Sequence, residues 1–190
     1  MYTATFIRRH IFQLPAGQLF ATRHLLAYGS RAAVDQALYR LVRSGVIVRL
    51  ARGVFVRQEA GAGLPSALQV AAVKAQAFGK RIAAGGGELA RQFGLIGETP
   101  PGLTLRVNGS SSSFACGGAI VRLQRTCQRR MNLGDGPAGQ ALESLWHLGR
   151  TRVGPLEVEQ VTRAWGRRER QEMRQLITWL PDWISSHFAR

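Results

Sequence analysis

The chain has 190 residues, which is enough for one domain or two small ones with a hydrophobic core and no cross-links. Its formal net charge is +15 and its pI is about 11.6, and this balance favours a polyanionic partner. Cys116 and Cys127 are its two cysteines, which excludes a disulfide framework and a four-cysteine zinc site.

Of the 26 basic residues, 24 are arginines, whose planar donors suit phosphates and guanine edges. High-GC coding bias also enriches arginine, but it does not explain the shortage of acids. Neither a signal peptide nor an apolar run of membrane-spanning length is present. We therefore expect reduced thiols and a soluble, cytoplasmic protein with no membrane partner.

The first third of the chain is the most basic. Residues 1–57 hold nine arginines and one acidic residue, Asp35, so their charge density is more than twice that of the rest. The segment 57–65, RQEAGAGLP, has no apolar period and is typical of a linker. The sequence therefore predicts a basic domain at 1–60 and a second domain at 65–190.

Three helices are predicted in the basic domain. Residues 3–14 carry apolar side chains at helical spacing, and the breaker PAG follows them. Thr22 is expected to cap a short second helix that ends at Gly29, in the left-handed conformation. Ser30 caps a third helix that ends at Gly45. The apolar residues of this third helix fall on one arc: Val34, Ala37, Leu38, Leu41 and Val42.

The opposite arc of the third helix is polar, cationic and free of acids. It carries Ala32, Gln36, Tyr39 and Arg43, with Arg40 at its edge and Arg31 in the first turn. An ordinary solvated surface is the alternative interpretation, although such a surface usually mixes both signs of charge. The short turn YGS before this helix is typical of a helix-turn-helix.

After Gly45 the apolar period changes from helical to alternating, which predicts strands at 46–50 and 54–56 around a turn at Arg52 and Gly53. Three helices followed by such a hairpin predict a winged helix-turn-helix. In that fold the third helix enters the major groove, and Arg49 and Arg52 reach phosphates or the minor groove. The predicted DNA-binding residues are Ser30, Arg31, Gln36, Tyr39, Arg40, Arg43, Arg49 and Arg52.

The second domain is predicted to be mixed α/β, which makes the whole chain an α+β protein. A helix from Pro65 to Gly79 has a stripe of Leu68, Ala71, Ala72, Ala75 and Phe78. A short strand and a two-turn helix follow in RIAAGGG and ELARQFGL. Strands are expected in LTLRV and in AIVRL at 119–123, with NGSSSSFACGG as the connection. Three helices then close the chain, marked by Leu142, by Val158 and by Met173.

No catalytic constellation is evident in the sequence. The run AAGGGELA suggests a phosphate cradle, but it lacks the spacing of known phosphate-binding motifs, and a structural tight turn is the favoured interpretation. The histidines are scattered, and Glu157 and Glu159 point to different faces of one helix. We expect a binding protein rather than an enzyme, with no metal and no cofactor.

The segment from 20 to 56 also resembles a known family. The matching elements are S-x-x-A-V-x-x-A-L-x-R-L-V-x-x-G, from Ser30 to Gly45, and I-x-R-L-x-R-G-V-F, from Ile47 to Phe55. With the helix at 66–78 and GGGELARQFGLIGETP, they resemble AbiEi-type antitoxins and a related bacterial family of uncharacterised transcriptional regulators. Residues before about 125 carry most of this resemblance.

This resemblance implies an N-terminal winged helix that binds inverted repeats in the double-stranded DNA of its own promoter. It also implies a C-terminal domain associated with neutralising a nucleotidyltransferase-type toxin. We expect an autorepressing antitoxin that is a monomer or a DNA-induced dimer. Two alternatives stay open: an unrecognised nucleic-acid enzyme in the second domain, and a winged helix that binds protein alone.

Overall fold

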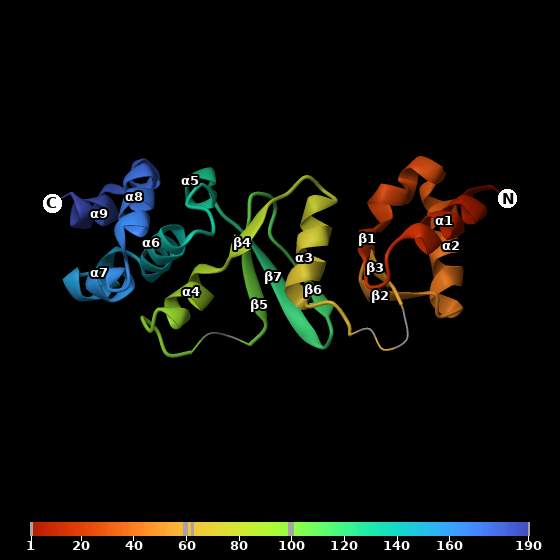
Figure 1. The fold of residues 1–190 in the computed structure, drawn as a ribbon, viewed down its shortest axis with the longest axis horizontal. Helices are drawn as coiled ribbons and strands as arrows, with labels where there is room; N and C mark the ends of the chain where they lie inside the picture. Colours follow the sequence, from red (N-terminus) through yellow and green to blue (C-terminus); the bar gives the residue numbers. More distant parts are fainter. Residues whose placement is uncertain (1, 59–60, 62, 99–100, 190) are drawn as a thin grey trace. The chain divides into compact units, whose positions relative to one another are not determined.

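The structure is a computed structural model that describes residues 2–58, 61, 63–98 and 101–189. It combines helices with a three-stranded and a four-stranded sheet (Figure 1), which confirms the predicted α+β class. By its internal contacts the chain divides into two compact units. The first unit is Met1–Arg81 with Phe114–Val121, and the second is Ile82–Ser113 with Arg122–Arg190.

The predicted linker, 57–65, falls inside the first of these units. Its residues 59, 60 and 62 lie outside the described part of the chain. Within the described residues, no helix combines the length and the apolar character needed to cross a membrane.

Three helices open the first unit: α1 (Tyr2–Gln13), the 3-10 helix η1 (Thr22–Tyr28) and α2 (Arg31–Arg43). Their order confirms the predicted helices, with two corrections for the second. It is a 3-10 helix preceded by Ala21, and Thr22 is its first residue rather than its cap. Gly29 has a φ of 162°, which is extended rather than left-handed. A Cβ at Gly29 would meet the Thr3 side chain at 2.5 Å, so close packing favours glycine there.

A three-stranded sheet follows in the order β1-β3-β2, with β1 at Leu19–Ala21, β2 at Ile47–Ala51 and β3 at Val54–Arg57. Both pairings are antiparallel, and Phe20 lies opposite Phe55. The hairpin of β2 and β3 confirms the predicted strands. The sequence does not predict β1, because three residues are too few to show an alternating pattern.

The central strand β3 is buried on both of its faces. Phe55 packs into the core formed with α1, η1 and α2, which includes Ile7, Leu25 and Leu38. Val54 and Val56 point to the other face and are also buried. The helix α3 (Ala67–Gln76) contacts β1 and β3, and so belongs to the first unit.

The predicted apolar stripe of α3 is partly wrong. Leu68 and Phe78 are 51% and 59% exposed, whereas Val70, Ala71 and Ala75 are buried. The start of the helix is fixed by a capping box, in which Ser66 and Gln69 exchange hydrogen bonds. The small residues Ala71 and Ala75 lie on the buried side of α3, where they leave room for a close approach to its neighbours.

The four-stranded sheet has the order β4-β5-β7-β6. Its strands are β4 (Ile82–Ala84), β5 (Leu103–Val107), β6 (Ser112–Cys116) and β7 (Ala119–Arg125), and α4 (Gly86–Gln92) follows β4. The segment NGSSSSFACGG was predicted as a connection, but it contains β6. Gly117 and Gly118, with φ of 56° and 79°, form the turn into β7. The sequence does not predict this strand, because β6 is largely exposed and its serine-rich sequence shows no apolar alternation.

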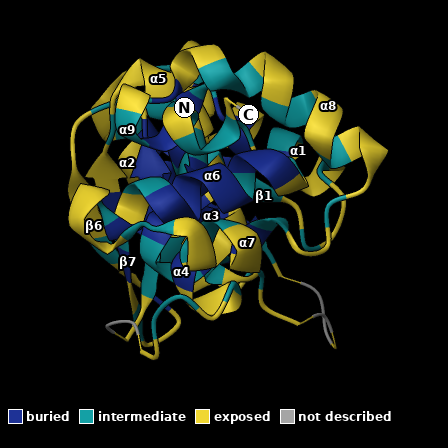
Figure 2. Cartoon of the chain, turned by 90° about the vertical axis from the view of Figure 1, so that its left-hand side faces the viewer, coloured by how far each residue is buried: buried dark blue, intermediate teal, exposed yellow. Residues whose placement is uncertain are grey.

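Helices make up the rest of the second unit. The three predicted helices are confirmed as α6, α7 and α8, and several short helices that the sequence does not predict are also present. In chain order, the helices are α5 (Gln128–Met131), α6 (Pro137–Leu148), η2 (Arg150–Arg152), α7 (Pro155–Thr162), α8 (Arg167–Leu176), η3 (Ile177–Trp179), α9 (Asp182–Ser185) and η4 (Ser186–Phe188). The core helix is α6, whose residues are mostly buried (Figure 2). Leu142 and Leu145 on α6 belong to two separate apolar clusters.

Candidate nucleic-acid interface

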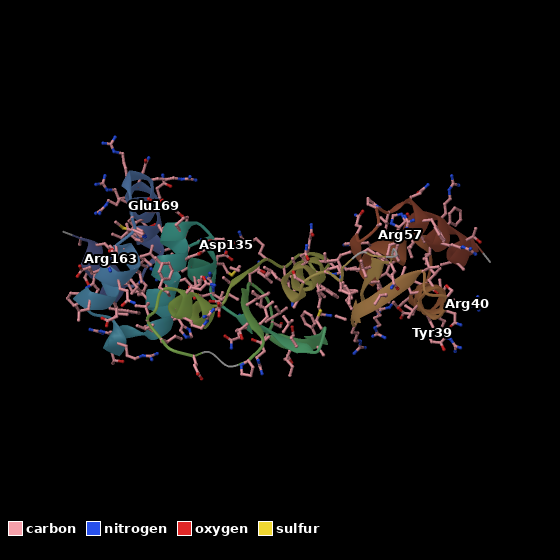
Figure 3. The ribbon with its side chains drawn as sticks, turned by 60° about the horizontal axis from the view of Figure 1, so that its bottom comes forward. Tyr39, Arg40, Arg57, Asp135, Arg163 and Glu169 are labelled. Atoms are coloured by element: carbon pink, nitrogen blue, oxygen red, sulfur yellow. The ribbon has the colours of Figure 1, made fainter. Side chains whose placement is uncertain are left out.

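Helix α2 presents an exposed polar face in the first unit. Ser30 begins the helix, and its Oγ accepts a hydrogen bond from the backbone N–H of Ala33 at 3.3 Å. Every predicted contact residue on this helix is exposed: Arg31, Gln36, Tyr39, Arg40 and Arg43. Tyr39 and Arg40 point outward from α2 (Figure 3). The buried side chains Val34, Leu38 and Leu41 fix which face turns outward.

Two contacts order the side chains of this face. The guanidinium of Arg43 donates a hydrogen bond to the Tyr39 hydroxyl at 3.2 Å, and its Cζ lies 6.0 Å from the centroid of the Tyr39 ring. These residues are one helical turn apart, so Tyr39 orients Arg43 before any ligand arrives. Among the described residues, Gln36 and Arg40 make no side-chain hydrogen bond or ion pair.

The prediction that this face has no acidic neighbour is wrong at Arg31, which forms an ion pair with Asp35. Its Nε donates to Asp35 Oδ2 at 2.8 Å, and the two side chains are 62% and 50% exposed. An exposed pair of this kind contributes only about 0–1 kcal/mol, so a phosphate can displace the carboxylate at little cost. Asp35 therefore lowers the net positive charge around Arg31, but it leaves the Arg31 guanidinium accessible to an anion.

The hairpin of β2 and β3 carries the other two predicted residues. Arg49 and Arg52 are exposed, and Gly53 completes the turn with a φ of 79°. The pairing of β2 with β3 shifts between Arg49 and Ala51, which marks a β-bulge. Such a bulge increases the local twist of a strand and can redirect a side chain.

Lys74 on α3 adds a third cation at this turn, and it is not among the predicted DNA-binding residues. Its Nζ donates to the carbonyl oxygen of Arg52 at 2.8 Å and lies 5.2 Å from the Phe114 ring centroid. Burial, followed by the charges of Arg52 and Arg49, lowers the pKa of Lys74 below 10.5. Arg49, Arg52 and Lys74 thus place three cations at this turn, and none of them has a carboxylate partner among the described residues.

Arg57 has a structural role despite belonging to the same basic segment. Its Nη1 donates to the carbonyl oxygens of Phe12, at 2.9 Å, and Leu14. The last carbonyls of a helix lack partners within the helix, and a cation there also suits the helix dipole. Arg57 therefore links the end of β3 to the end of α1, and its guanidinium is engaged in these contacts within the unit.

The second unit contains a buried ionic cluster around Glu143. Glu143 is fully buried and accepts hydrogen bonds from Arg106, at 3.1 Å, and from Arg130. Arg106 also donates to the carbonyl oxygens of Ala84 and of Arg130, at 2.8 and 2.7 Å. Because its polar atoms are satisfied within the unit, this cluster fastens β4, β5, α5 and α6 together.

The glycine run before α4 is explained by packing. A Cβ at Gly85 would overlap the carbonyl oxygen of Thr104, and a Cβ at Gly86 would lie 2.6 Å from that of His147. This supports the predicted structural turn over a phosphate cradle. Among the described residues, no three His, Cys, Asp or Glu side chains are grouped to hold a metal ion.

Residues 6–173 match the model of a family of unknown function, DUF6088. The chain belongs to the DUF6088 family. The matched segment of this DUF6088 protein contains every residue of the predicted DNA-binding set, Lys74 and the Glu143 cluster. A comparison with curated proteins gives no significant match.

Proposed function

We propose that this protein is a transcriptional regulator that binds double-stranded DNA through a winged helix-turn-helix. In this proposal α1, η1 and α2 form the helical part, α2 is the recognition helix, and the hairpin of β2 and β3 is the wing. The observation that carries it is the exposed Arg, Gln and Tyr face of α2, in the same unit as a hairpin turn with three cations. Helices of this kind read base edges while the wing contacts the backbone.

Roles follow from the chemistry of the exposed side chains. Arg40 and Arg43 have the donors that suit guanine O6 and N7, and Gln36 suits the adenine edge. The contact with Tyr39 holds Arg43 in place, which lowers the entropy cost of ordering it on DNA. Ser30 and the first turn of α2 would receive a phosphate, since helix N-termini favour anions.

The wing would supply affinity that does not depend on sequence. Arg49, Arg52 and Lys74 present positive charge to phosphates, and binding releases the counterions condensed on DNA. If about five to seven phosphates are neutralised, log K should fall with log salt with a slope of about −4.5 to −6. Titration of DNA from upstream of the gene at several salt concentrations measures this slope. A slope near zero would reject the proposal.

We further propose that the target is the promoter of its own gene, and that the protein is an autorepressing antitoxin of the AbiE kind. The resemblance of Ser30–Gly45 and Ile47–Phe55 to that family supports this proposal. Its toxin would be of the nucleotidyltransferase type, and inverted repeats would be bound by a monomer or by a DNA-induced dimer. Footprinting of the upstream DNA and co-purification with the product of the neighbouring gene test these two parts separately.

The same assays separate this proposal from its two alternatives. A nucleic-acid enzyme in the second unit would nick DNA or turn over nucleotides when magnesium is added. A winged helix that binds protein alone would leave duplex DNA unshifted at physiological salt. Sequence-dependent binding without turnover is the result that the proposal requires.

A further inference from the structure

Helix α8 in the second unit has an outer face made entirely of arginine and glutamine. When successive residues are turned by 100°, its exposed positions fall on one continuous arc. These positions are Arg167, Arg168, Arg170, Gln171, Arg174 and Gln175. The remaining positions are half-buried, and two of them, Met173 and Leu176, pack against the core.

Both acidic residues of α8 are turned away from this arc and are used within the unit. Glu169 Oε2 accepts a hydrogen bond from the backbone N–H of Gly166 at 2.8 Å and so caps the helix. Glu172 accepts from the backbone N–H of Ala138, and its carboxylate lies against Gly136. The carboxylates therefore hold α8 in place and leave the arginines of the outer face without acidic partners.

The outer face of α8 carries four exposed arginines and no acidic residue. Arg163, which follows α7, is also exposed. Within the described residues, no carboxylate oxygen lies within ion-pair distance of Arg163 or of the four arginines of α8. In Figure 3, side chains ending in nitrogen project outward from the helix that carries the labelled Glu169. The four unpaired guanidinium groups on the outer face of α8 repel one another, and an anionic ligand relieves that repulsion.

The side-chain chemistry selects the class of ligand. Protein interfaces usually centre on a buried aromatic or apolar anchor, and the outer arc of α8 contains none. Single-stranded nucleic acid is bound on aromatic stacking platforms, which this arc also lacks. A duplex backbone needs only donors and positive charge. Ten helical residues span about 15 Å, which corresponds to about four phosphates of one strand along the duplex axis.

We propose that the outer face of α8 is a second contact surface for the phosphate backbone of a nucleic-acid duplex. It lies in a different unit from the proposed winged helix and does not depend on that proposal. Its contribution is independent of sequence, because it makes no use of base edges.

The test compares two double variants of the full chain. Arg170→Gln with Arg174→Gln removes two charges from α8, and the matched control, Arg125→Gln with Arg150→Gln, removes two exposed charges from other elements of the second unit. Binding of a random-sequence duplex is followed by fluorescence anisotropy over a salt series, and thermal unfolding by circular dichroism confirms that both variants fold. The α8 variant should reduce the magnitude of the salt slope by about 1.8, and the control by less than half of that.

Three outcomes would overturn the inference. An unchanged slope in the α8 variant would show that the duplex does not touch this face, and an acidic protein partner would then be the occupant to seek. Equal changes in both variants would mean that net charge alone matters. Preferential binding of single strands, lost in the α8 variant, would assign the face to another ligand. A wild-type protein that binds all duplexes alike, and loses affinity in the α8 variant, would support α8 while rejecting the proposed sequence-specific regulator.

Discussion

Lys74 donates a hydrogen bond from Nζ to the carbonyl oxygen of Arg52 at 2.8 Å, and this contact joins α3 to the turn of the proposed wing. The same ammonium lies 5.2 Å from the Phe114 ring centroid. A two-stranded hairpin by itself is only marginally stable in water. Support from α3 and from β1 therefore gives the turn a fixed position from which Arg49 and Arg52 can reach a backbone.

Replacing Lys74 with methionine should weaken binding to all duplexes, specific and random alike, by about 3- to 10-fold. This range corresponds to the loss of one hydrogen bond of ordinary net strength. The matched control is Lys80→Met, which removes the same charge from the other lysine of the chain. Fluorescence anisotropy with both duplexes measures the effect. Equal losses in the two variants would mean that Lys74 acts through net charge and not through the wing.

Lys74 should also make stability depend on pH. Because its pKa is lowered by burial and by Arg52 and Arg49, the unfolded chain binds more protons than the folded one in the range just below 10.5. The free energy of unfolding should therefore gain a rising component with pH across that range. Urea unfolding of the wild type and of Lys74→Met at matched pH isolates it. A variant with the same pH dependence as the wild type would contradict the lowered pKa.

Base contacts and backbone contacts predict different mutational patterns. Arg40→Ala should cost about 1–3 kcal/mol on the specific site and relax the preference at one base pair, because Arg40 is exposed on α2 and free to reach a base edge. Arg52→Ala should weaken all sequences to a similar extent. Competition binding with single-base variants of the site distinguishes them. If both variants lose affinity equally on specific and random DNA, Arg40 does not contact a base and is not part of the recognition face.

The Glu143 cluster predicts a large effect on stability. Glu143→Gln leaves the buried Arg106 and the half-buried Arg130 without their carboxylate and should destabilise the second unit by about 3–5 kcal/mol. Glu159→Gln, an exposed carboxylate on α7, is the control and should have little effect. All four tryptophans lie in the second unit, so their fluorescence during urea unfolding reports on it directly. A loss below about 1 kcal/mol would remove the cluster from its structural role.

Local periodicity predicted most of the first unit. The apolar arc of α2, the cap at Ser30 and the hairpin around Gly53 are encoded by neighbours in the sequence, so their positions could be read directly. Strand β1 could not, because it exists through pairing with β3, which is distant in the chain. The exposure of the predicted contact residues likewise followed from the burial of the opposite arc.

Features that depend on tertiary contacts could not be predicted from local sequence patterns. Lys74 lies on a helix assigned to the second domain, and only the packing of α3 on β3 brings it to Arg52. The strand β6 has a serine-rich, exposed sequence without an apolar alternation. The outer face of α8 was not predicted because glutamates and arginines are mixed in its sequence, and only the fold shows that Glu169 and Glu172 are bonded to the backbone N–H groups of Gly166 and Ala138.

Close packing at the glycine run before α4 leaves no room for a side chain at Gly85. Gly85 has an ordinary φ of −70°, so alanine is allowed by the backbone, but its Cβ would overlap the carbonyl oxygen of Thr104. Because the obstacle is backbone and cannot rotate away, Gly85→Ala should destabilise the second unit by about 1–3 kcal/mol. Gly97→Ala has open space around the new Cβ and should be close to neutral. Tryptophan fluorescence in urea again provides the measurement. If both variants unfold at the same urea concentration as the wild type, close packing is not the reason for glycine at position 85.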